Sequence, residues 1–184
     1  MRRQPLSNTA PIALIGAVVI VGIVLASPVP ASPDGAEWET VADPEGCQSC
    51  HLGSPDPTNS GALTIEGLPK VPEARHRYEL TIMLEDPELE NAGFMLSITS
   101  DAAAKGELAA IDERTETHGA MARSTYDGTT PAVAGKASWT LVWTAPASVE
   151  AAFSFDLWAN AGNWDFSPLG DHLHHRVWNL APAP

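Results

Sequence analysis

From Ala62 onward, apolar and polar residues alternate in short stretches. Four stretches show the alternation clearly: residues 76–86 (HRYELTIMLED), 93–101 (GFMLSITSD), 137–146 (ASWTLVWTAP) and 151–160 (AAFSFDLWAN). A β-strand sends successive side chains to opposite faces, so each stretch is typical of a strand with one buried face. The faces expected in the core carry Tyr78, Leu80, Ile82 and Leu84; Phe94, Leu96 and Ile98; Trp139, Leu141 and Trp143; and Phe153, Phe155 and Leu157.

Three weaker strand candidates cover residues 61–68, 106–114 and 171–181. Residues 100–113 have some helix propensity, but Gly106 in the middle favours a turn followed by a strand. The acidic stretch EDPELE, residues 85–90, is expected to be a solvated hairpin tip. Short strands separated by turn residues, without convincing helices, predict an all-β, Greek-key-type β-sandwich over residues 62–184.

The N-terminus has a different pattern. Arg2 and Arg3 precede an apolar run from Ile12 to Ala26, and small residues follow as far as Ala31. This is the layout of an export signal, with cleavage expected after Ala31. The run is shorter than the roughly 20 residues that span a bilayer, so residues 1–31 are interpreted as a signal peptide, with an uncleaved membrane anchor as the alternative. Residues 32–45 are polar and are expected to form a linker.

Residues 46–61 contain the only two cysteines of the chain, Cys47 and Cys50, and His51 follows directly. Two cysteines three residues apart lie on one side of a single helical turn, where each can add to one vinyl group of a haem. The next histidine then lies beneath the iron and supplies an axial nitrogen. The motif predicts haem c held by thioethers to Cys47 and Cys50, with His51 as an axial ligand of the iron.

Three other interpretations of the cysteines are weighed against haem. A thiol–disulfide redox pair needs a cysteine of low pKa, usually in a βαβ fold, which this pattern does not suggest. A zinc site would need a remote histidine in addition to Cys47, Cys50 and His51. A plain disulfide between residues so close together closes a very small loop and stabilises little. The haem interpretation also accords with export, because c-type haem is attached outside the cytoplasm.

The haem segment is too short to bury a porphyrin alone, so the sandwich is expected to supply the wall of the pocket. The succession of the C-x-x-C-H segment, the W-T-x-x-W-T-A-P strand (Trp139 to Pro146) and the N-A-x-N-x-D…G-D loop (Asn160 to Asp171) resembles the Reeler-like, choice-of-anchor V family of exported bacterial proteins. The resemblance covers roughly residues 45–178 and implies a β-sandwich of the Reeler or fibronectin type.

Two features depart from the family pattern. The family is named for variable C-terminal sorting signals, whereas this chain ends in NLAPAP, so we expect it to be free or held by its N-terminal segment. The Asn160–Asp171 loop also carries Trp164 and Phe166 where small polar residues are expected, which indicates a contact surface or aromatic cover for haem.

The second axial ligand of the iron has several candidates: His76, His118, His172, His174, His175, Met83, Met95 and Met121. Met83 and Met95 are interpreted as packing residues, and Met121 is a loop candidate. His118 is favoured because the resemblance implies a histidine in this region. Bis-histidine ligation would give a lower potential than His/Met ligation. Trp38, Trp164 and Trp178 are candidate neighbours of the haem.

Two further metal sites are weaker hypotheses. His172 and His174 share one face of the last strand and offer two ligands to a metal. The oxygens of Asn160, Asn163, Asp165 and Asp171 offer a calcium site, although these residue types also simply form turns.

Charge limits the partners. The 184-residue chain has 10 Lys and Arg, 23 Asp and Glu, and a formal charge of −13. Nucleic acid is therefore excluded as an expected partner, whereas a redox protein with a basic docking surface fits. We predict an exported, periplasmic or cell-surface monohaem cytochrome that transfers one electron and carries no enzymatic activity of its own. The alternatives are a surface binding or adhesion module in which haem is structural or sensory, and a small oxidase or peroxidase subunit.

Overall fold

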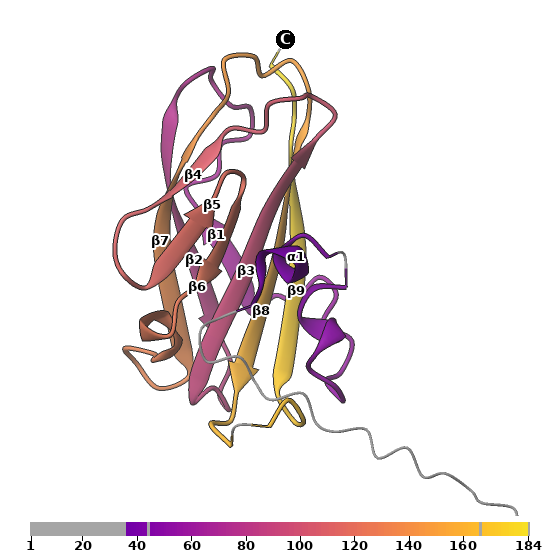
Figure 1. Cartoon of the computed structure of the whole chain (residues 1–184), viewed down its shortest axis with the longest axis vertical. Coiled ribbons are helices and arrows are strands. Elements are labelled where there is room, and N and C mark those ends of the chain that lie inside the picture. The colour runs from indigo at the N-terminus through magenta and orange to yellow at the C-terminus, as the bar shows by residue number, and fades with distance from the viewer. Residues whose placement is uncertain (1–35, 44, 166, 184) are drawn as a thin grey trace, which may run out of the picture.

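The computed structural model describes residues 36–43, 45–165 and 167–183. Nine antiparallel strands within these ranges form two sheets (Figure 1). The strands are β1 (Leu63–Glu66), β2 (Arg77–Glu85), β3 (Asn91–Ser100), β4 (Glu107–Ala110), β5 (Thr115–His118), β6 (Met121–Ser124), β7 (Lys136–Thr144), β8 (Phe153–Gly162) and β9 (His172–Leu180). The helical elements are α1 (Trp38–Val41) and two 3₁₀ turns, η1 (Gly46–Ser49) and η2 (Asp127–Thr129).

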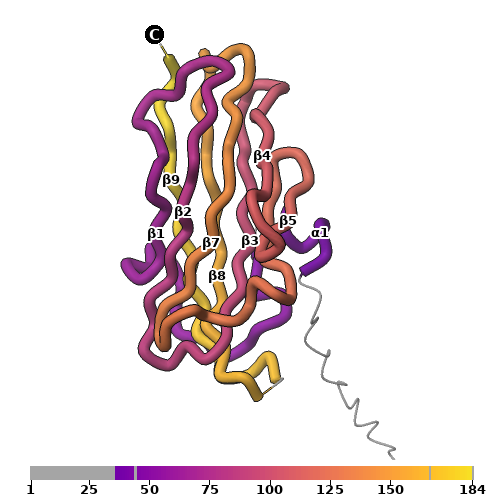
Figure 2. Tube along the Cα trace, turned by 90° about the vertical axis from the view of Figure 1, so that its left-hand side faces the viewer, coloured from indigo at the N-terminus to yellow at the C-terminus, as the bar shows by residue number. Residues whose placement is uncertain are grey.

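One sheet has the strand order β1-β2-β7-β4, and the other has the order β5-β6-β3-β8-β9. The two long central pairs, β2 with β7 and β3 with β8, belong to different sheets. The chain crosses between the sheets at the β2–β3, β3–β4, β4–β5, β6–β7 and β7–β8 connections. Figure 2 shows β1, β2 and β7 side by side, with α1 on the far side of β3. The predicted β-sandwich is confirmed.

The alternating pattern correctly predicted which strand faces form the core. Leu80, Leu141, Phe155 and Leu157 are fully buried between the sheets. The rings of Trp143 and Phe155 meet edge to face, with centroids 5.0 Å apart. The predicted turn at Gly106 is also present: Gly106 has φ +81°, which favours glycine, and β4 begins at the next residue.

The hairpin of β5 and β6 was not predicted from the sequence. Its residues, TETH and MARS, are short and polar and give no clear alternation. The hairpin forms because β6 pairs with β3, with Met95 opposite Arg123. These two strands therefore form through sheet pairing rather than through a local sequence pattern. Strand formation commonly depends on such tertiary context.

The predicted linker, residues 32–45, contains a helical turn that packs on the sandwich. α1 contacts β3 and β6, and η1 contacts β8, so the N-terminal segment lies on the outer face of the five-stranded sheet (Figure 1). A second apolar cluster forms there from Val41, Cys47, Met95, Trp158 and Leu173. Residues 1–35, and with them the signal peptide or anchor and its cleavage point, lie outside the described residues.

Candidate functional site

The three residues of the C-x-x-C-H motif line one cavity. The start of β3, from Asn91 to Met95, lines the same cavity as Cys47, Cys50 and His51. The cavity has a volume of about 410 Å³, within the roughly 300–1,000 Å³ typical of pockets for small molecules and cofactors. The outer face of the sandwich therefore supplies part of the wall of this cavity.

The two cysteines differ in exposure although they share one turn. η1 carries Cys47, and the amide of Cys50 donates to the carbonyl of Cys47 at 3.3 Å, which closes the turn. Both cysteines are free thiols; Cys47 is buried and Cys50 is exposed. Burial and the neighbouring Cys50 raise the pKa of Cys47 to about 12. A thiol–disulfide redox centre needs the opposite shift.

His51 is held by a buried carboxylate. Its Nδ1 lies 2.6 Å from Oδ2 of Asp171, and Asp171 is 5% exposed. The amide of Asn160 donates to the same oxygen at 3.2 Å. A neutral histidine whose Nδ1–H is given to a carboxylate has its lone pair on Nε2. In the neutral form of His51, this contact therefore leaves Nε2 as the nitrogen available to a ligand.

The segment after His51 runs beside the last strand and its loop. The amide of Leu52 donates to the carbonyl of Pro168 at 3.0 Å, and that of His175 donates to the carbonyl of Pro57 at 2.9 Å. Ser54 Oγ accepts the amide of Leu173 at 2.8 Å. These bonds satisfy backbone groups of β9 and fix the motif against the sheet.

The donor set and the cavity wall fit a covalently bound haem. Two cysteines and a histidine line one space, and Gly93, which has no side chain, lines it as well. Asn91 and Asn160 belong to the same lining. Their side-chain oxygens are buried and accept no hydrogen bond within the described residues.

The other candidate axial ligands are distributed unevenly. Met95 lines the cavity and is 5% exposed. His118 lies on β5, packs against the ring of Trp38 at a centroid distance of 5.6 Å, and does not line the cavity. His76, Met83, Met121 and the three histidines of β9 are likewise absent from its lining. Of the three tryptophans considered, Trp164 lines it.

His172 and His174 do lie close together, but the imidazoles of both contact the carboxylate of Asp86. Oδ2 of Asp86 is 2.9 Å from Nδ1 of His172 and 3.2 Å from Nε2 of His174. The prediction of a solvated hairpin tip at residues 85–90 is therefore wrong. The stretch connects β2 and β3, which belong to different sheets, and Asp86 is only 6% exposed because β9 supplies hydrogen bonds to it. The described residues contain no group of three or more His, Cys, Asp or Glu side chains placed to hold a metal ion.

The proposed calcium loop is built from hydrogen bonds among its own residues. Asn163 donates to Asp165 at 3.2 Å and accepts its amide at 3.1 Å, whereas Asp171 faces His51 and Asn160. Asn160, Asn163, Trp164, Asp165 and Asp171 all line the cavity. Phe166 lies outside the described residues.

Sequence reasoning missed the pairing of Asp171 with His51 and the position of Met95 in the cavity wall. No local signal marks the first, since 120 residues separate the partners. The alternation in β3 did indicate the second, because it placed Met95 on the face opposite Phe94 and Leu96. The missing information was that the N-terminal segment covers that face.

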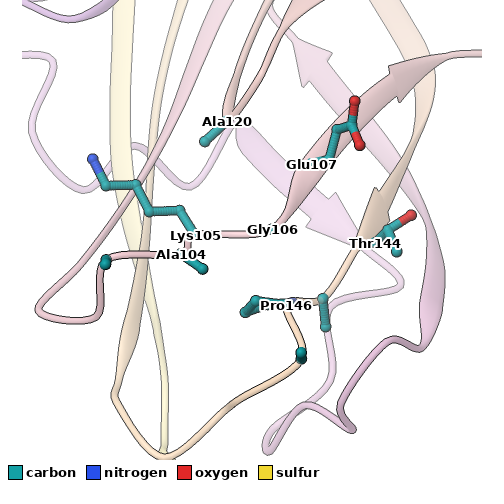
Figure 3. Close-up of a pocket in the computed structure, with 10 residues that line it drawn as sticks. Ala104, Lys105, Gly106, Glu107, Ala120, Thr144 and Pro146 are labelled. Carbon is teal, nitrogen blue, oxygen red and sulfur yellow. The ribbon is translucent and has the colours of Figure 1, made fainter.

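A second hollow of about 610 Å³ lies where β4 and β7 meet their loops (Figure 3). Its lining is mostly small: Ala104, Gly106, Ala120 and Pro146, with Lys105 and Glu107 as its charged residues. No thiol, imidazole or aromatic group lines it, so it offers little of the chemistry found at the first cavity.

Comparison with solved structures identifies the fold. The Reelin-N domain of F-spondin aligns with a TM-score of 0.53 and 14% identity over 76% of this chain and 97% of that one. Two structures of the human F-spondin reeler domain align at TM-scores of 0.44 and 0.45, with 15% and 17% identity, over 66% of this chain and 88% and 91% of theirs. No protein-family model and no curated protein matches the chain.

The fold and the site together define a Reeler-like β-sandwich that carries a C-x-x-C-H segment on the outer face of its five-stranded sheet. The structural similarity concerns the fold, since the identity is 14%. None of the described helices is long and apolar enough to cross a bilayer.

Proposed function

We propose that the protein is an exported monohaem c-type cytochrome that transfers single electrons. The observation that carries the proposal is the cavity that Cys47, Cys50 and His51 line together with the start of β3. Haem bound there would supply an Fe(II)/Fe(III) couple. The two thiols would hold it covalently, and His51 Nε2 would be the first axial ligand.

Met95 is the best-placed second axial ligand. Among the candidate histidines and methionines of the described chain, it is the one that lines the cavity. It also belongs to the same apolar cluster as Cys47. A His/Met pair favours a higher potential than the bis-histidine pair with His118 that the sequence suggested.

The competing uses of the cysteines are less well supported. The raised pKa of Cys47 keeps its thiol protonated, which disfavours thiol–disulfide exchange. A zinc site at the motif would need a fourth ligand, and the described residues contain no group of three or more His, Cys, Asp or Glu side chains placed to hold a metal ion. Haem attachment uses both thiols and the free Nε2 together.

The acidity of the chain suggests a partner with a basic docking surface. The formal charge is −13, and complementary charge speeds encounter between small redox proteins. Export fits the same picture, because residues 1–31 have the layout of a signal peptide or membrane anchor. We place the protein in the periplasm or at the cell surface.

The test is a pyridine haemochrome spectrum with intact-protein mass, on material made in a host with c-type maturation factors. Wild type should carry one covalent haem, and Cys47→Ala and Cys50→Ala should each lose one thioether and give a weakened or absent covalent haem signal. Gln48→Ala is the matched control, since Gln48 is exposed on the same turn. A wild-type mass equal to that of the bare chain would refute the proposal.

The absorption spectrum of the haem-loaded protein separates the electron carrier from its alternatives. A six-coordinate, low-spin iron with one reversible potential is expected for electron transfer. A high-spin iron that binds carbon monoxide would instead indicate a sensor or an oxidase-like subunit.

A further inference from the structure

We propose that Asp171 is a positioning residue that sets the hydrogen bonding of His51 and so lowers the reduction potential of the site. This inference rests on the proposed function, because it concerns the haem ligand. It goes further by assigning the potential to a residue that lies 120 positions from the motif.

The contact is short and buried. His51 Nδ1 and Asp171 Oδ2 are 2.6 Å apart, His51 is 23% exposed and Asp171 is 5% exposed. Hydrogen bonds to an ionised group are shorter and roughly twice as strong as neutral ones, and low local dielectric strengthens them further. A buried carboxylate also needs compensation, which the Nδ1–H of His51 and the amide of Asn160 supply.

The backbone holds both partners in place. The amide of Leu52, next to His51, is bonded to the carbonyl of Pro168. A parallel bridge joins Leu52 to Leu169, two residues before Asp171. On the other side, Asp171 directly precedes β9, which pairs with β8 along its length. The imidazole and the carboxylate therefore meet between two anchored segments.

A carboxylate at Nδ1 makes Nε2 a stronger electron donor, because the shared proton leaves more negative charge on the ring. Ferric iron gains more from such a donor than ferrous iron does, so the couple shifts toward Fe(III). Hydrogen bonding around the axial ligand is one of the recognised means by which a protein sets haem potential.

Asn160 allows a test of the direction in which the reduction potential shifts. Its Nδ2 donates to the same oxygen, Oδ2 of Asp171, that receives the proton of His51. Removing this competing donor leaves the carboxylate a better acceptor for His51, and the potential should fall. Removing the carboxylate should raise it. A merely structural role for the two residues predicts no such opposition.

The experiment compares midpoint potentials of the haem-loaded wild type, Asp171→Asn, Asn160→Ala and Asp156→Asn. Asp156 is the charge-matched control, since it forms another carboxylate–histidine contact on the same sheet, 2.9 Å from His175. Asp171→Asn should raise the potential by about 59 mV, a tenfold change in the one-electron equilibrium. The rise should exceed that of Asp156→Asn, and Asn160→Ala should shift the potential downward.

A second measurement keeps the inference testable where Asp171→Asn fails to accumulate. The Nδ1 proton of His51 should give a far-downfield NMR signal in a diamagnetic ferrous form of the wild type, moved further downfield by Asn160→Ala. Equal shifts for Asp171→Asn and Asp156→Asn, or absence of the His51 signal, overturn the inference while covalent haem in wild type leaves the proposed function standing. Wild type without covalent haem overturns the proposed function itself.

Discussion

The indole of Trp158 occupies the space that a side chain at Gly46 would need. A Cβ built on Gly46 would lie 2.5 Å from the ring, and Gly46 has φ +50°. Gly46→Ala should therefore loosen the motif from the sheet, at a cost of about 1–3 kcal/mol for overpacking. Hydrogen exchange of residues 46–60 should rise in the variant, and covalent haem should be less well protected from solvent.

Gly119→Ala is the control for this substitution. Gly119 has a similar backbone angle, φ +60°, but nothing lies within 4 Å of its would-be Cβ. Gly119→Ala therefore measures the backbone strain of an alanine with positive φ, without a clash such as that with Trp158. Equal exchange at residues 46–60 in the two variants would argue against the proposed packing.

In the haem-loaded protein that we propose, Met95→Leu should change the coordination of the iron. Leucine preserves the apolar volume next to Cys47 but removes the thioether. We expect the low-spin spectrum of the wild type to become high-spin and carbon monoxide to bind. His118→Ala should leave the spectrum unchanged, since His118 packs on Trp38. The reverse pattern would restore His118 as the second ligand.

The two thiols should react at very different rates in folded, haem-free protein. Burial and Cys50 raise the pKa of Cys47 from 9.0 to about 12, which lowers its thiolate fraction roughly a thousandfold at neutral pH. Iodoacetamide should modify exposed Cys50 first and Cys47 slowly, as peptide mass mapping over time would show. In urea the difference should vanish; equal rates in the native protein would contradict the buried position of Cys47.

The contact of His172 with Asp86 should make stability depend on pH. The hydrogen bond to Asp86 is the largest cause that raises the pKa of His172 above 6.5. The stabilisation is fully present below about pH 6.5 and is lost as the pH rises through the folded-state pKa. His172→Ala should therefore lower the urea midpoint more at about pH 5.5 than at about pH 8.5.

His174 limits how this prediction is measured. Burial lowers its pKa, so its contribution is lost as the pH falls below 6.5 and opposes that of His172. The informative quantity is the difference between wild type and His172→Ala at each pH. His76→Ala, at an exposed position before β2, is the control. A His172→Ala effect of equal size at both pH values would rule out a charged His172–Asp86 pair.

Local sequence was enough for the strands because alternation is a local property. The core faces of β2, β3, β7 and β8 follow from apolar residues at every second position, as Leu80 and Phe155 show. It was not enough for β5 and β6, which exist through their pairing with β3. It was also not enough for Asp86, whose burial depends on contacts with His172 and His174 near the far end of the chain.

The sequence by itself determined the sandwich and the turn that places Cys47, Cys50 and His51 together, because a period of two and a three-residue spacing act within single elements. Only the tertiary structure decided what the motif faces. The sequence alone did not specify which apolar surface the N-terminal segment packs on. Because the segment packs on β3 and β8, Met95, Asp171 and Asn160 lie at the C-x-x-C-H motif. Contacts between distant segments depend on how the faces of whole strands and helices pack together, and a local sequence pattern does not determine that packing.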